Sequence, residues 1–126
     1  MNISNEYQPE PIHNDKLATW ELVIFEYDDE LSTIDYIKEE VINIFKERDE
    51  FGRNKHGTPL QPFNGRDSLF DALQENLDLI VYLRNAVEES TDDWKTKSNL
   101  WSCYLIAVNS FENLYMIYKQ SYHTSA

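Results

Sequence analysis

The sequence predicts an all-α fold, a small bundle of about four helices with one long ordered loop between the two central helices. Hydrophobic residues make up 41% and aromatic residues 13% of the 126 residues, which is enough for the core of one domain. Apolar residues recur at three- and four-residue steps through much of the chain after Ser32. All three glycines and two of the four prolines fall in the stretch 52–65. We therefore expect a single helical domain over residues 15–122.

The first two segments precede the clear periodic pattern. Residues 1–14 are polar and contain Pro9 and Pro11, so a flexible N-terminal arm is expected. Residues 17–27 are apolar at nearly every position, which fits a buried helix or a strand. Helix is favoured because no other segment supplies strand partners.

An amphipathic helix is predicted after Ser32. Ser32 and Asp35 have the spacing of a capping box with Asp in place of the usual Glu. An apolar stripe follows, formed by Ile34, Ile37, Val41, Ile44 and Phe51. The helix is expected to end near Gly52, and the connection of about 15 residues that follows is long enough to be functional.

Two further helices complete the predicted bundle. Ser68 and Asp71 repeat the capping pattern, and a leucine-rich stripe predicts a helix to about Glu88. The last helix is expected from Trp94 to about Tyr118, with Cys103 as a buried thiol. Its aromatic residues exceed the needs of a small core, so we expect a homodimer or homotetramer.

Composition excludes several classes of function. The formal net charge of −12 repels a phosphate backbone, so no direct binding of nucleic acid is expected. The longest apolar runs fall far short of the roughly 18 residues that span a membrane, and no signal sequence opens the chain, so a cytoplasmic protein is expected. One cysteine and three scattered histidines exclude disulfide and zinc-finger scaffolds.

Carboxylates on the two central helices suggest a metal site. Glu75 and Asp78 are three residues apart and therefore share one face of their helix. Glu47 and Glu50 have the same spacing near the end of the preceding helix. If the helices pack antiparallel, the four side chains bring their oxygens together, and such clusters suit Mg²⁺ or Mn²⁺.

Basic residues are concentrated between these carboxylates. Five of the chain's 11 cations fall within the 21 positions 46–66. We predict that Arg53, Lys55 and Arg66 bind the phosphates of a nucleotide. His56, Phe63 and Tyr82 are the candidates for contacts with the base or sugar.

The run from Glu47 to Arg84 reads ERDEFGRNKHGTPLQPFNGRDSLFDALQENLDLIVYLR. It resembles small phage and prophage proteins similar to the MazG-like, all-α nucleoside triphosphate pyrophosphohydrolases. That family carries E-E-x-x-E on one helix and E-x-x-D on the next. The segment Glu75-Asn-Leu-Asp78 fits the second half.

The first half departs from the family pattern. Glu47-Arg-Asp-Glu50 supplies a spaced pair with Lys46 in the leading position, whereas Glu39-Glu40-Val-Ile-Asn43 has the leading pair and ends in Asn. The resemblance implies a phage-encoded enzyme in which Glu47, Glu50, Glu75 and Asp78 hold Mg²⁺. It also implies that Glu47 or Glu50 serves in catalysis, and that an NTP or dNTP is split into a monophosphate and pyrophosphate.

The alternative is a protein without catalysis. The incomplete leading Glu favours a nucleotide-binding protein on the same scaffold. The net charge of −12 favours a protein-binding module, such as an acidic counter-defence protein that mimics DNA and blocks a nucleic-acid enzyme.

Overall fold

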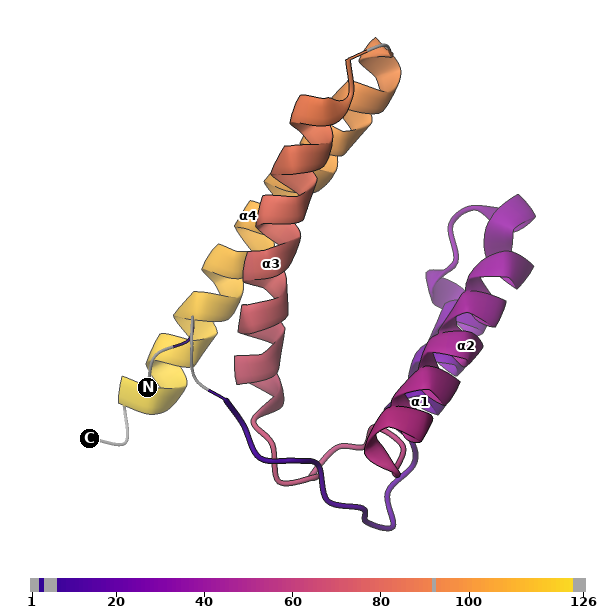
Figure 1. Cartoon of the computed structure of the whole chain (residues 1–126), viewed down its shortest axis with the longest axis vertical. Coiled ribbons are helices and arrows are strands. Elements are labelled where there is room, and N and C mark those ends of the chain that lie inside the picture. Colours follow the sequence, from indigo (N-terminus) through magenta and orange to yellow (C-terminus); the bar gives the residue numbers. More distant parts are fainter. Residues whose placement is uncertain (1–2, 4–6, 92, 124–126) are drawn as a thin grey trace. The chain divides into compact units, whose positions relative to one another are not determined.

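The computed structural model describes residues 3, 7–91 and 93–123, and every regular element in that part of the chain is helical (Figure 1). The predicted all-α class is confirmed. None of these helices carries an apolar stretch long enough to cross a bilayer.

The chain divides into two compact units. The first, which we call the 8–66 unit, is formed by Gln8–Arg66, and the second by Ile3, Tyr7 and the residues from Asp67 onward. We call the second the hairpin unit. The single domain expected over residues 15–122 stays a prediction, since it concerns the docking of the two units.

The 8–66 unit is built on two helices. Helix α1 (Thr19–Glu26) continues into a π-helical turn, η1 (Tyr27–Leu31). A short 3₁₀ segment, η2 (Asp35–Ile37), then leads into α2 (Lys38–His56). The segment that the sequence left between helix and strand is thus helical from Thr19.

Aromatic side chains join α1 to α2. The ring of Phe45 on α2 lies 5.3 Å from the ring of Trp20 and also 5.3 Å from that of Tyr27. Such contacts add to the burial of apolar area and fix the neighbouring rings. The contact with Phe45 therefore fixes the position of the Trp20 ring beside α2.

The predicted end of α2 was wrong. Gly52 lies inside the helix, which continues for one more turn to His56. The helix ends where Gly57 adopts a left-handed conformation with φ of 74°, and its N–H donates to the carbonyl of Arg53. Gly57 is the stop signal because glycine takes this conformation without a steric penalty.

The predicted capping box at Ser32 does not form. Ile34 is the residue that precedes η2, and no side chain caps that end. The hydroxyl of Ser32 is buried and finds no hydrogen-bond partner among the described residues. The chain enters α2 through η1 and η2, and these irregular turns have no simple spacing rule.

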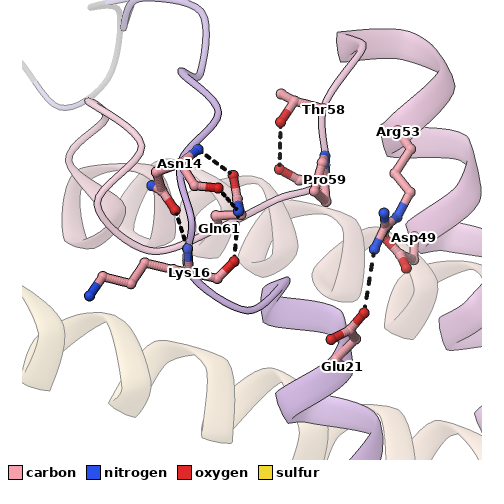
Figure 2. Close-up of polar contacts among 8 residues, drawn as sticks. All are labelled: Asn14, Lys16, Glu21, Asp49, Arg53, Thr58, Pro59 and Gln61. Carbon is pink, nitrogen blue, oxygen red and sulfur yellow. Dashed lines mark hydrogen bonds and ion pairs between the residues drawn. The ribbon is translucent and has the colours of Figure 1, made fainter.

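Polar contacts hold the segment before α1 against the loop after α2. The side-chain amide of Gln61 donates to the carbonyls of Asn14 and Lys16 at 2.9 and 2.7 Å, as Figure 2 shows. The backbone N–H of Ile12 donates to the carbonyl of Asn64 at 2.8 Å. Gln61 and Asn64 are both 3% exposed, so the predicted ordered loop has a buried, hydrogen-bonded interior.

The hairpin unit consists of α3 (Ser68–Glu89) and α4 (Trp94–His123), which lie side by side (Figure 1). Its core is the cluster of Phe70, Leu73 and Tyr118. A buried hydrogen bond crosses the seam, from the side-chain amide of Asn76 to the carbonyl of Ala107 at 2.9 Å.

Two details of this unit differ from the sequence prediction. Asp67, one residue before Ser68, caps α3 by accepting a hydrogen bond from the N–H of Phe70 at 3.1 Å. The buried thiol predicted for Cys103 was wrong, because Cys103 is exposed. Within its unit α4 packs against a single helix, so only a narrow stripe of its surface is covered.

Candidate functional site

The predicted site residues are divided between the two units. Seven lie in the 8–66 unit: Glu47, Glu50, Arg53, Lys55, His56, Phe63 and Arg66. Three lie on α3 of the hairpin unit: Glu75, Asp78 and Tyr82. The four-carboxylate site draws two residues from each unit, and it stays a prediction.

Glu75 and Asp78 share an open hollow on the surface of α3. Both side chains are exposed, and they line this hollow together with Ile3, Gln74 and Leu77. Neither carboxylate has an ion-pair partner within the described residues. Both are therefore available to a cation.

Glu47 and Glu50 are exposed on α2, and a carboxylate that was not predicted lies between them. Asp49 accepts a hydrogen bond from Nε of Arg53 at 2.9 Å, and its side chain is only 17% exposed. The other end of the Arg53 guanidinium lies 3.9 Å from Glu21 on α1 (Figure 2). Arg53, predicted to bind phosphate, is thus engaged by two carboxylates of its own unit.

The described residues of the two units contain no ready-made group of metal ligands. Within the described residues, no three side chains among His, Cys, Asp and Glu come together as ligands. The magnesium site expected from the sequence therefore stays a prediction.

The remaining predicted site residues have different surroundings. The guanidinium of Arg66 donates to the carbonyl of Pro9 at 2.6 Å and ties the N-terminal segment to the loop. Phe63 has a positive φ of 57° and is 85% exposed, with the ammonium of Lys16 at 5.8 Å from its ring centre. Tyr82 is 67% exposed on α3.

A cavity of about 240 Å³ lies within the 8–66 unit. It is open to one side and is lined by the last turns of α2, the start of α1 and the segment Thr58–Leu60. Residues that bear on its chemistry are Trp20, Arg48, Phe51, Gly52, Lys55 and His56. Lys55 and His56 belong to the predicted site, whereas Trp20 was not predicted.

Basic side chains outnumber acidic ones among the residues that line this cavity. Arg48 lies over the ring of Phe51 at 4.9 Å, and Lys55 has no ion-pair partner among the described residues. Asp49, the one acidic lining residue, is already paired with Arg53. The imidazole of His56 lies 3.3 Å from the carboxylate of Glu10. In a chain of net charge −12, such a recess favours an anionic ligand with an apolar part.

Comparisons with protein-family models, with curated proteins and with solved structures found no match. The MazG-like resemblance of the run from Glu47 to Arg84 therefore stays a prediction that rests on the residues themselves.

Proposed function

We propose that the protein is a cytoplasmic, phage-encoded, magnesium-dependent nucleoside triphosphate pyrophosphohydrolase that converts an NTP or dNTP to a monophosphate and pyrophosphate. The observation that carries the proposal is the cavity of the 8–66 unit, where Arg48 and Lys55 meet aromatic walls in a strongly acidic chain. An aromatic surface beside cations is the combination that a nucleotide requires.

The cations have unequal roles in this proposal. Lys55 is expected to contribute most to phosphate binding, because no carboxylate neutralises it among the described residues. Arg53 and Arg66 were predicted for the same task but hold protein partners. They support the loop and add to the positive potential around the phosphates.

The carboxylates fit a hard divalent cation. Glu47, Glu50, Glu75 and Asp78 would hold Mg²⁺ or Mn²⁺, since carboxylate oxygens are the preferred ligands of these ions. When bound, the metal supplies Lewis-acid polarisation of the phosphate and of water.

The chain's own residues complete the reaction. The second carboxylate oxygen of Glu47 or Glu50, the one not bound to the metal, would accept the proton of the attacking water. The water oxygen bonds to the α-phosphorus, the bond from that phosphorus to the bridging oxygen breaks, and pyrophosphate leaves. Lys55 stabilises the negative charge on the phosphates.

The proposal is tested by removing single carboxylate charges. Glu75→Gln and Asp78→Asn should each lower pyrophosphate release by at least about 100-fold, as expected for loss of a charge at a metal-assisted step. Glu89→Gln, an exposed change on the last turn of the same helix, serves as the control and should be neutral. Full activity in both test variants would remove the mechanism.

A second candidate is a protein that binds a nucleotide without hydrolysing it. Lys46 occupies the leading Glu position of the family pattern and lines a hollow with Glu39 and Asn43. A cation there opposes metal binding. Recovery of intact triphosphate after incubation with Mg²⁺ would favour this candidate.

We also propose that the protein is a homodimer or homotetramer. Several large apolar side chains on α4 are exposed, among them Ile106 at 67%, Met116 at 54% and Ile117 at 50%. Exposed apolar residues in this number favour association. Sedimentation equilibrium should give at least twice the monomer mass of 15.0 kDa.

A further inference from the structure

No feature of the backbone or of the packing around Gly52 requires a glycine at this position. It lies in the interior of α2, where glycine is a poor helix former. Positive φ angles explain Gly57 and Gly65 but not Gly52. A methyl group added at Gly52 would meet no atom within 4 Å.

Gly52 also lines the 240 Å³ cavity. Because neither the backbone nor the packing requires glycine here, the space left by its missing side chain is available to a ligand. Departures from local preference of this kind are expected at functional positions.

The walls and size of the cavity define which part of a ligand it accepts. Trp20 and Phe51 provide aromatic surface, and Pro59 and Leu60 add apolar surface. The contact with Phe45 holds the Trp20 ring in place. Pockets for whole small molecules usually measure about 300–1,000 Å³, so this cavity suits one ring system of a larger ligand.

We propose that the cavity binds the base of a nucleotide, that Arg48 and Lys55 bind its phosphate, and that Gly52 leaves room for the ring. This inference rests on the proposed function for the class of ligand. It assigns the base contacts to Trp20 and Phe51 in place of Phe63 and Tyr82.

The test is calorimetric titration of the full chain without divalent cation, so that binding is measured separately from hydrolysis. The ligands are nucleoside monophosphates, the matching nucleosides and inorganic pyrophosphate. We expect the best monophosphate to bind at least tenfold tighter than its nucleoside or pyrophosphate. Lys55→Gln should weaken binding of the monophosphate and leave binding of the nucleoside unchanged. Lys46→Gln should change the affinity for neither ligand.

Gly52 variants probe the ring position directly. Gly52→Leu should weaken binding of the monophosphate at least tenfold, and Gly52→Ala should weaken it by a smaller factor. Gly52→Ala should also raise the melting temperature of the protein. Asn54→Ala is the matched control, because it changes an exposed residue of α2 that is not among those lining the cavity. It should bind as the wild type does. If Gly52→Leu does not fold, a more stable Gly52→Ala with weakened binding supports the proposal.

Other results overturn the inference. Unchanged affinity in both Gly52 variants contradicts it, as does binding of pyrophosphate but no monophosphate, or of no ligand at all. If the Gly52 variants release pyrophosphate with the same KM as the wild type, the inference is contradicted and the proposed function is retained. Monophosphate binding that depends on Gly52, without any triphosphate hydrolysis, would leave the inference standing and remove the catalytic proposal.

Discussion

The two units of this chain are held together in different ways. In the hairpin unit an apolar seam closes over Phe70 and Leu73, which are 1% and 0% exposed. In the 8–66 unit the buried residues include the polar Gln61 and Asn64, and Ala18 is the one buried hydrophobic residue among those described. The contrast indicates that the hairpin unit derives its stability from burial. Hydrogen bonds in the 8–66 unit shape a loop and a cavity, and such positioned loops commonly carry function.

The largest effect should come from opening the apolar seam. Leu73→Ala removes a fully buried side chain from α3 and should lower the free energy of unfolding by about 2–5 kcal/mol. Urea unfolding followed by circular dichroism measures the change. Leu79→Ala, at a position 47% exposed on the same helix, is the matched control and should cost much less. Equal losses in the two variants would contradict the assignment of the core.

The next effect should come from the polar network. Gln61→Met keeps the size of the side chain but removes the donors to the carbonyls of Asn14 and Lys16. The loss of these buried hydrogen bonds should cost about 1–3 kcal/mol. Hydrogen exchange should accelerate around residues 12–16 and 57–66 while α3 and α4 keep their protection. Accelerated exchange at Leu73 of the same size would show that the difference between the units does not hold.

A smaller effect of opposite sign is expected at Gly52. Gly52→Ala should stabilise the protein by about 0.8–1 kcal/mol, because alanine is the better helix former and the added methyl group meets no atom within 4 Å. Thermal unfolding measures the shift. A lower melting temperature would mean that the backbone or its neighbours require glycine at this position.

The smallest effect should occur at the start of α4. The side-chain hydrogen bond from Thr96, with the backbone N–H of Lys95, holds the pKa of Asp93 below its ordinary value of 3.8. The carboxylate therefore stabilises the folded state fully above pH 3.8, and this contribution is lost as the pH falls through the lower pKa of the folded state. Asp93→Asn, which keeps an acceptor but removes the charge, should be slightly less stable than the wild type at pH 7. The difference should shrink as the pH falls below 3.8, and a difference that is constant with pH would contradict the charge effect.

The sequence predicted the helices better than it predicted their ends. Long apolar stripes identify α2, α3 and α4. The stripes of α3 and α4 bury Leu73 and Tyr118, whereas the described residues of α2 include no buried side chain. Ile44 and Phe51 of the predicted α2 stripe are 59% and 55% exposed. Gly52 was a misleading stop signal, since a helix tolerates a single glycine. The end of α2 depends instead on the backbone conformation of Gly57.

The cavity shows which parts of a site a sequence reveals. Lys55 and His56 were found from the local concentration of cations, and both line the cavity, although their roles stay predictions. Asp49 could have been found from its four-residue spacing to Arg53, which is typical of an ion pair along a helix. Trp20 had no local signal, because its place beside the end of α2 depends on contacts between residues far apart in the sequence.

Phosphorus NMR of the full chain with Mg²⁺ and a panel of nucleoside triphosphates tests the proposed function most directly. We predict that at least one triphosphate is replaced by equal amounts of its monophosphate and pyrophosphate, and that chelation of Mg²⁺ stops the conversion. Triphosphates that all remain intact, or that yield a diphosphate and orthophosphate, would contradict cleavage between the α and β phosphates.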